Sequence, residues 1–192
     1  TYYVYDDLGQ QRYVLPPAQH ETLTDGTTYT PSQLHKLSYY TEYDDKGQAV
    51  RQWNPGTDCV YSLYDRRGRL AMTQSGKQRT ANEWSFTKYD RMDRPVLSGI
   101  VTGGTYESHK VALDATTVLY EERGTAVHGY TNQSYPSVAA EGDYLSVTYY
   151  DDYDWLPEND PHAFSTTDAL GRTPNYRVQG QSTGSKSKVL GI

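Results

Sequence analysis

The clearest structural signal in this chain is the stretch Tyr64-Asp65-Arg66-Arg67-Gly68-Arg69-Leu70. Its opening pattern, Tyr-Asp-x-x-Gly, occurs in strict form twice more, from Tyr5 to Gly9 and from Tyr43 to Gly47. A random chain of this composition would contain roughly 0.1 such matches, so three matches indicate an internal repeat. The sequence therefore predicts a protein built largely from one recurring unit.

Each copy has the chemistry of a tight hairpin loop. An aspartate at the first turn position accepts hydrogen bonds from backbone amides two or three residues further on. Two variable residues follow in right-handed conformation, and glycine then supplies the position with φ > 0. The pattern predicts a type I turn that closes with a bulge. The structural repeat-turn residues of the strict copies are Tyr5, Asp6, Gly9, Tyr43, Asp44, Gly47, Tyr64, Asp65 and Gly68.

Two further copies carry aspartate in place of the glycine. They are Tyr89-Asp90-Arg91-Met92-Asp93 and Tyr150-Asp151-Asp152-Tyr153-Asp154. Aspartate is one of the few residues other than glycine that tolerate left-handed geometry. We therefore expect Asp93 and Asp154 to take φ > 0, and we add Tyr89, Asp90, Asp93, Tyr150 and Asp151 to the repeat-turn residues.

The residues around the turns alternate as strand residues do. Cys59, Tyr61 and Leu63 share one face by the period of two. The same spacing groups three residues ahead of the fourth turn, namely Trp84, Phe86 and Lys88. The fold class that follows is mainly β: an antiparallel sheet of repeat hairpins, open or spiralling, with one or two short helical insertions.

Two segments have helical signals. Thr30 is a candidate N-cap, followed by Pro31 at the first helical position and Gln33 three residues after the cap, which predicts a short helix near 31–37. A second helix is predicted from about Ser108 to Arg123 by an apolar stripe. Residues 120–124 fit a worn repeat turn as an alternative.

These elements divide the chain into three ranges that we expect to form one structural unit. Residues 1–104 are a hairpin region, 105–124 a helical insertion, and 125–192 a further hairpin region with a loop tail. Residues 134–142 and 180–188 are rich in small and polar side chains, which predicts loops.

Composition indicates a folded, β-rich chain. Tyrosine is present 20 times against 2 phenylalanines, and mean hydropathy is -0.84. Tyrosine combines a large apolar ring with a hydroxyl that needs a partner, so it suits half-buried sheet faces. Cys59 is the single cysteine, which excludes an intrachain disulfide. The chain begins at Thr1 without an initiator methionine, so we expect an internal fragment of a longer protein.

The charge argues against nucleic acid as a partner. The formal net charge is -6, and the one basic cluster, 66–69, lies in a predicted turn. No stretch has the apolar length of a membrane-spanning helix. No cofactor is indicated, and the sequence alone leaves the localisation unknown.

The candidate catalytic and metal residues are weak. Ser182 lies in a G-x-S-x-G string at 180–184, but no alternating β-α pattern supports a nucleophile elbow, and a flexible loop is preferred. The histidines have no metal-ligand spacing, and are His20, His35, His109, His128 and His162. We therefore expect no enzyme activity and name no catalytic, cofactor-binding or metal residue.

One acidic run leaves calcium open. It comprises Asp151, Asp152, Asp154, Glu158 and Asp160. These carboxylates could supply several oxygen ligands, but the run lacks the glycine and distal glutamate of an EF-hand. Turn chemistry explains Asp151 and Asp154 without a metal.

The residues resemble the YD repeat of RHS proteins, whose usual form is Y-D-x-x-G-R-L. Tyr64 to Leu70 matches that form in full, and the segment 61–99 looks like the large RHS proteins of Bacteroides-type bacteria. The resemblance implies an extended sheet of hairpins that spirals into a hollow shell, around a toxic C-terminal domain or within a large surface protein. It also implies a secreted or cell-envelope location. The self-cleaving core segment of the family has no match here, and Asp168 to Arg172 fits a worn turn better.

The sequence leaves three candidate functions for the chain. The leading one is a non-enzymatic shell or scaffold segment whose partner is the remainder of the parent RHS protein, with a C-terminal toxin as possible cargo. The alternative is an aromatic-lined module that binds carbohydrate or protein, and the third is a hydrolase. A sheet cut from a longer one would expose edges near 1–5 and 176–179, which predicts an edge-strand dimer.

Overall fold

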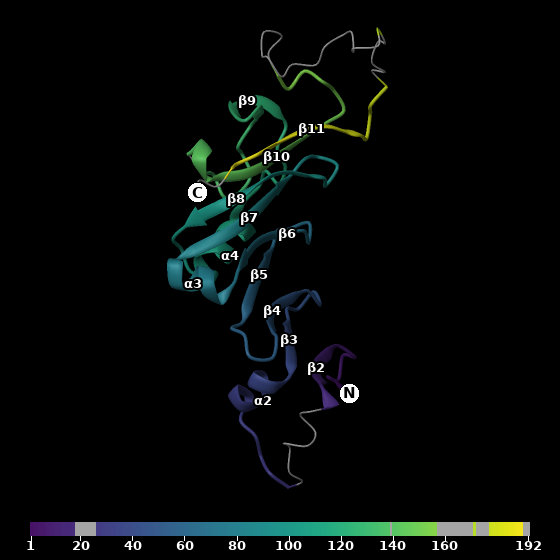
Figure 1. The fold of residues 1–192 in the computed structure, drawn as a ribbon, viewed down its shortest axis with the longest axis vertical. Coiled ribbons are helices and arrows are strands. Elements are labelled where there is room, and N and C mark those ends of the chain that lie inside the picture. The colour runs from purple at the N-terminus through teal and green to yellow at the C-terminus, as the bar shows by residue number, and fades with distance from the viewer. Residues whose placement is uncertain (18–25, 139, 157–170, 172–176, 190–192) are drawn as a thin grey trace. The chain divides into compact units, whose positions relative to one another are not determined.

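The computed structural model describes residues 1–17, 26–138, 140–156, 171 and 177–189 (Figure 1). Its main feature there is one open antiparallel sheet in the order β1-β2-β3-β4-β5-β6-β7-β8-β10-β11. The fold class predicted from the sequence is therefore confirmed. The strands are β1 (Tyr2–Tyr5), β2 (Gln11–Leu15), β3 (Tyr39–Tyr43), β4 (Ala49–Trp53), β5 (Val60–Tyr64), β6 (Leu70–Gln74), β7 (Glu83–Tyr89), β8 (Pro95–Thr102), β10 (Tyr144–Tyr150) and β11 (Ser182–Ser187).

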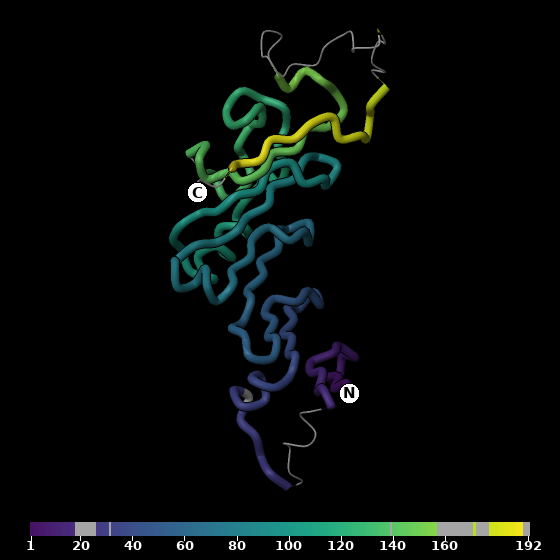
Figure 2. Tube along the Cα trace, in the orientation of Figure 1, coloured from purple at the N-terminus to yellow at the C-terminus, as the bar shows by residue number. Residues whose placement is uncertain are grey.

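The sheet is a succession of hairpins, because each of its strands is hydrogen-bonded to the next strand of the sheet along the chain; β9 (Arg123–Val127) is not part of this order. Figure 2 traces the chain in the orientation of Figure 1. The hairpin β5–β6 pairs Leu63 with Met72 and then Tyr64 with Leu70, so one residue bulges out next to the turn. The same shift occurs in β1–β2 and β3–β4. The recurring bulge shows that one turn design closes these three hairpins.

Contacts divide the chain into two compact units, which cut across the three predicted ranges. The first comprises 1–86 and 101–115, and the second 87–100 and 116–192. The first unit buries Leu63, Met72, Trp84, Phe86 and Leu113, among others. The second unit buries Leu97, Val127, Tyr130, Val147 and Tyr149, among others. Burial alternates along β7, so Trp84, Phe86 and Lys88 share one buried face, as expected.

Two short helices have matching caps. α2 (Pro31–Leu37) begins after Thr30, whose side chain and that of Gln33 form the predicted capping box. A further helix, α3 (Gly76–Ala81), was not predicted from the sequence and lies between β6 and β7. Ser75 and Gln78 form the same capping box there, and this Ser-x-x-Gln signal was available in the sequence.

The third helix is shorter than predicted. α4 (Tyr106–Ala115) ends well before Arg123. Thr116 and Thr117 follow it, and β-branched residues favour extended backbone over helix. The chain then runs through Glu121, whose amide donates to the Tyr89 carbonyl at 2.7 Å, into β9 (Arg123–Val127). Residues 120–124 therefore form neither the predicted helical end nor the alternative repeat turn.

The predicted loop tail contains a strand. β11 pairs antiparallel with β10, although its sequence of serine, threonine, glycine and lysine has little intrinsic strand preference. Trp155 explains one position, because a Cβ on Gly184 would meet its ring at 2.2 Å. Pairing with β10 thus overrides the local sequence. The second sheet edge lies at β11 and not near 176–179, of which residue 176 lies outside the described residues.

Candidate functional site

The repeat turns have the geometry that the sequence predicts. The glycines at the fourth position have φ of 76° at Gly9, 76° at Gly47 and 80° at Gly68. Asp93 takes φ of 63° in the fourth copy, so aspartate does replace glycine there. These positions lie in the left-handed region, where a β-branched residue would be strained.

The turn aspartate organises the loop. Oδ1 of Asp65 accepts from the backbone amides of Arg67 at 2.9 Å and Arg69 at 3.0 Å. The Asp65 amide in turn donates to the Arg69 carbonyl at 2.9 Å. The other turn aspartates accept from the same two relative positions, and are Asp6, Asp44 and Asp90. The second amide thus lies four residues after the aspartate, whereas two or three residues were predicted. One carboxylate oxygen therefore closes each loop and leaves the other for a second partner.

Tyrosine, the first residue of each copy, joins one repeat to the next. The Tyr43 hydroxyl donates to the Gln11 carbonyl at 3.0 Å, and the Tyr64 hydroxyl donates to the Ala49 carbonyl at 3.0 Å. Each acceptor is the fifth residue after the aspartate of the preceding turn. We call these bonds the tyrosine ladder. Phenylalanine could not make them, which accounts for the preference for tyrosine at this position.

Arginine takes the second carboxylate oxygen in three copies. Nε of Arg69 donates to Asp65 at 2.8 Å, Arg94 to Asp90 at 2.6 Å, and Arg12 to Asp6 at 2.7 Å. Arg94 also bonds both oxygens of Asp151, at 3.0 and 2.6 Å, and lies 4.2 Å from the centre of the Tyr150 ring. Its hydrogen bond lowers the pKa of Asp151 to about 2.

Four residues after the turn aspartate, the second copy has Gln48 where the third and fourth copies have Arg69 and Arg94; the first copy also has a glutamine there, Gln10, and its arginine is Arg12, six residues after Asp6. Gln48 reaches the next turn instead, where its Nε2 donates to the Gly68 carbonyl at 3.0 Å. The described contacts of the Asp44 carboxylate are two backbone amides, those of Lys46 and Gln48, and no basic side chain. This turn aspartate therefore has an oxygen without a cationic partner.

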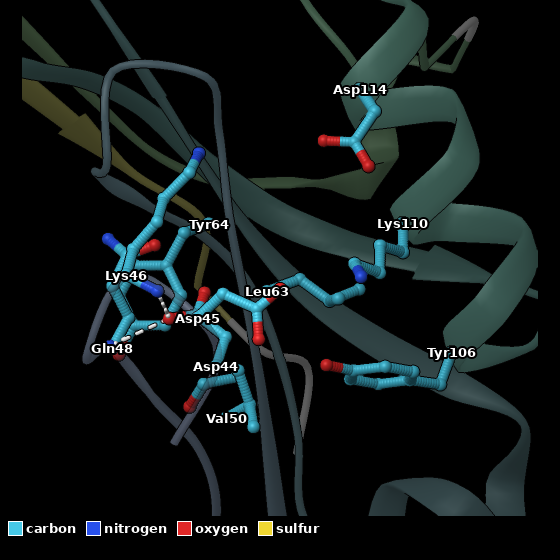
Figure 3. A pocket seen from close by; sticks show the side chains of 11 residues that line it. Asp44, Asp45, Lys46, Gln48, Val50, Leu63, Tyr64, Tyr106, Lys110 and Asp114 are labelled. Atoms are coloured by element: carbon cyan, nitrogen blue, oxygen red, sulfur yellow. Dashed lines mark hydrogen bonds between the residues drawn. The ribbon is translucent and has the colours of Figure 1, made fainter. Parts of the chain in front are cut away.

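Beside Asp44 lies a pocket of about 340 Å³, which we call the α4 pocket (Figure 3). The turn of the second copy and Tyr64 form one side, and α4 forms the other. α4 contributes Tyr106, Lys110 and Asp114, and the turn contributes Asp44, Asp45, Lys46 and Gln48. Burial raises the pKa of Tyr64 and Tyr106, so both remain neutral hydroxyl groups at neutral pH. This pocket has no signal in the sequence, because it depends on how α4 packs.

The fifth copy is not a local hairpin turn, which corrects one prediction. Asp154 does not take a positive φ; Asp151 does, at 73°. The Asp151 amide donates to the Gln181 carbonyl at 3.1 Å, and the Asp151 carboxylate accepts from the Gly180 amide at 2.6 Å. Gly180 has φ of 82°, and Tyr150 pairs with Ser182 across a bulge. Gly180, Gln181 and Ser182 therefore correspond to the glycine and the two residues after it in an intact copy.

The fifth repeat is therefore split into two halves. Its Tyr-Asp half is at 150–151 and its glycine half at 180–182, with residues 152–179 inserted between them. Tyr150 still contributes to the tyrosine ladder, since its hydroxyl donates to the Pro95 carbonyl at 3.3 Å. Pro95 is the fifth residue after Asp90, as the ladder requires.

Two members of the acidic run have arginine partners. Asp151 pairs with Arg94, and Asp152 pairs with Arg123 at 2.7 Å. Glu158 and Asp160 lie outside the described residues. Within the described part of the chain, no group of three histidine, cysteine or acidic side chains could hold a metal ion. Calcium binding at this run stays a prediction without support from Asp151 or Asp152.

The other candidate residues are placed as follows. Ser182 begins β11 and is not at a strand-to-helix turn. His109 contacts the Gly103 carbonyl at 2.9 Å and packs edge-on against Trp84. His128 packs edge-on against Tyr144. His20 and His162, like 168–170 and 172, lie outside the described residues. None of the described helices is long and apolar enough to cross a membrane.

Aromatic side chains in the first unit stack on one another. His35 lies 4.3 Å from Tyr40 and 4.7 Å from Trp53, measured between ring centres, and Tyr13 lies 4.4 Å from Tyr40. Burial lowers the pKa of His35. Rings that pack into a continuous layer favour a scaffold, whereas a binding cleft would present coplanar exposed rings.

The comparisons with known proteins give no family for this chain. A scan against protein-family models finds no match, and a search of curated proteins finds no significant match. Function must therefore be argued from the geometry of the repeats and the pocket.

Proposed function

We propose that this chain is a non-enzymatic structural segment of a large RHS/YD-repeat protein, in which its hairpins form consecutive parts of a longer sheet. The tyrosine ladder is the observation that carries the proposal. A bond from each copy to the backbone of the preceding copy can be repeated without limit, because it requires only one more tyrosine and one more carbonyl.

The residues of the repeat pattern each support this function. Aspartate closes the loop, glycine supplies the left-handed residue, and tyrosine links the copies. A pattern whose residues all serve turn closure and repeat contact is what a scaffold requires. A binding or catalytic repeat would instead direct some of them toward a ligand.

A structure of the full-length parent protein, by electron cryomicroscopy, tests the proposal. Tyr5 begins the first copy and is 57% exposed, and the ladder predicts that its hydroxyl donates to a carbonyl of a preceding repeat. We expect the sheet to continue beyond β1, with a further strand paired to it. A parent protein in which β1 faces solvent and Tyr5 has no repeat partner would contradict the proposal.

Binding of a partner protein at the α4 pocket is a second candidate function. Its supporting observation is the Asp44 carboxylate, which lacks the arginine present in the other copies, beside the Tyr64 ring. Asp45 and Asp114 add negative charge, and with Lys46 and Lys110 the charged side chains that line the pocket sum to −1. An arginine side chain from another protein would fit, because guanidinium groups pair with carboxylates and lie over aromatic rings.

This second candidate can be tested with an arginine peptide on the folded chain. We expect the amide signals of residues 44–48 to shift on titration in NMR spectra, and the shifts to disappear in the variant Asp44→Asn. The matched control is the same peptide with lysine in place of arginine, which should shift these signals less. Equal shifts with both peptides, or shifts that persist in the variant, would contradict a guanidinium site.

A further inference from the structure

Lys88 extends into the interior of the second unit, where three functional groups meet. Its side chain has 0% exposure, as does that of Glu121. Nζ of Lys88 lies 2.6 Å from Oδ1 of Asn132 and 3.3 Å from Oε1 of Glu121. Lysine is rarely buried in full, and a buried lysine is the form in which its amine becomes a nucleophile. We call these residues, with Tyr144, the Lys88 cluster.

Besides its bond to Lys88, the Glu121 carboxylate accepts four further hydrogen bonds. Oε1 accepts from the Ser134 amide at 2.9 Å and the Ser134 hydroxyl at 2.6 Å. Oε2 accepts from the Thr131 hydroxyl at 2.7 Å and the Gln133 amide at 2.9 Å. Burial acts to raise the pKa of Glu121, but these bonds and the Lys88 charge outweigh it, so the pKa is lowered. The carboxylate therefore has a fixed position next to the lysine.

Asn132 presents its side-chain amide to the lysine in one orientation. Nδ2 donates to the Val138 carbonyl at 2.9 Å, which fixes the amide plane. Oδ1 accepts from the Tyr144 hydroxyl at 2.9 Å as well as from Lys88. Asn132 also has φ of 53°, a conformation that few residues other than glycine adopt. Two donors on one carbonyl oxygen withdraw electrons from the carbonyl carbon and prepare it for attack.

We propose that Lys88 and Asn132 form an intramolecular isopeptide bond, with Glu121 transferring the proton and Tyr144 stabilising the developing oxyanion. Burial lowers the pKa of Lys88, which favours the neutral amine, although the nearby Glu121 carboxylate opposes this effect. Nζ of Lys88 is held 2.6 Å from Oδ1 of Asn132, the oxygen bonded to the carbon that it would attack, and groups held in contact react as if each were very concentrated. This inference concerns a modification of the chain itself and is independent of the proposed scaffold function.

The reaction is balanced without any oxidant or cofactor. The Lys88 ammonium gives a proton to Glu121, and the Nζ lone pair then attacks Cγ of Asn132. A Cγ–Nζ bond forms, negative charge develops on Oδ1, and the Tyr144 hydroxyl donates to it. Nδ2 takes up protons, one of them through Glu121, and the Cγ–Nδ2 bond breaks. An ammonium and a primary amide thus become a secondary amide and one ammonium ion, and Glu121 ends as it began.

The intact mass of the purified, denatured wild-type protein tests the proposal. We expect it to fall below the sequence mass by one ammonia, about 17 Da. Protease digestion should then release one branched peptide that contains both Lys88 and Asn132. Full sequence mass in the folded wild-type protein would overturn the proposal, whatever the variants do.

Variants separate this bond from other losses of ammonia. Lys88→Met and Glu121→Gln should retain the full mass of their own sequences. Asn132→Asp should condense with loss of water and reach the same final mass as the reacted wild type. Cyclisation of Asn132 with its own backbone also releases ammonia, but that product would persist in Lys88→Met and would give no branched peptide. A loss of ammonia that persists in Lys88→Met, or the absence of a branched peptide, would overturn the isopeptide assignment.

Discussion

Two pockets beside repeat turns differ in how their carboxylates are neutralised. The α4 pocket in the first unit contains Asp44 without an arginine partner. In the second unit, a pocket of about 370 Å³ is lined by Asp90 and Asp151, and both are bonded to Arg94. The first arrangement leaves the turn carboxylate without a described cationic partner, whereas the second pairs both carboxylates with an arginine of the same chain. One repeat design therefore occurs both with and without this internal neutralisation, and only the copy without it could pair with a cation from outside.

Removing Arg94 should give the largest loss of stability among the changes considered. Arg94→Gln leaves two partly buried carboxylates without their guanidinium, and we expect the free energy of unfolding to fall by about 3 kcal/mol. Urea denaturation measures the change. The matched control is Arg66→Gln, in an exposed turn position, which should change stability by less than about 0.5 kcal/mol. Equal effects of the two substitutions would remove the distinction between the pockets.

Acid should weaken the same contact. The hydrogen bond from Arg94 lowers the pKa of Asp151 to about 2 from an ordinary 3.8, so the contribution of this carboxylate is present above about pH 4. It is lost as the pH falls from about 4 through 2, because protonation of Asp151 removes the ion pair. Thermal unfolding followed between pH 5 and pH 2 should show a smaller decline for Asp151→Asn than for wild type. Parallel declines would mean that Asp151 has no such role.

Gly68→Val should destabilise the third turn by about 2 kcal/mol, because a β-branched residue is strained at φ of 80°. Crowding adds to the effect, since a Cβ at this position would lie 3.1 Å from Nε2 of Gln48. Asp93→Gly at the matching position of the fourth copy should have the opposite sign and stabilise the protein. Chemical denaturation measures both variants, and a destabilised Asp93→Gly would show that the two turns are not equivalent.

Tyr64→Phe should cost about 1 kcal/mol, the usual value of one hydrogen bond, because it removes one bond of the tyrosine ladder. Tyr61→Phe is the control, since the described contacts of Tyr61 are made by its ring. Differential scanning calorimetry can resolve the two. A ladder without energetic value would give the same transition temperature for both.

Gln48→Arg should have the smallest effect and convert the α4 pocket toward the other type. We expect the new arginine to pair with Asp44 and to stabilise the chain by about 0.5 kcal/mol, the value of a partly exposed ion pair. The gain should vanish in the background of Asp44→Asn, which retains the turn hydrogen bonds. Gln48→Arg should also no longer bind the arginine peptide. A gain that persists without the Asp44 charge would not come from this pair.

The sequence predicted features that depend on neighbours in the chain. The turn glycines, the α2 capping box and the buried face that contains Lys88 all follow from spacing over a few residues. β11 could not be predicted, because its polar residues become a strand only through pairing with β10. The early end of α4 could have been suspected from Thr116 and Thr117.

The candidate sites required tertiary structure. Gln48 at an arginine position is visible in the sequence, but the pocket exists because α4 packs beside Asp44. The buried position of Lys88 follows from the alternation in β7, yet nothing local indicates that Glu121 and Asn132 would meet it. Long-range pairing of this kind leaves no periodic signal in a single sequence.

The split fifth repeat changes what counts as a copy in this kind of protein. The Asp151 amide still donates to the carbonyl of the residue after the glycine, Gln181, although residues 152–179 intervene. The repeat geometry therefore depends on where the residues lie in the sheet and not on their being contiguous in the sequence. A search that demands an intact Tyr-Asp-x-x-Gly string would overlook such copies and underestimate the number of hairpins. The split repeat also shows that the interval between Asp151 and Gly180 is a place where evolution, or a designer, can add a foreign segment without interrupting the sheet.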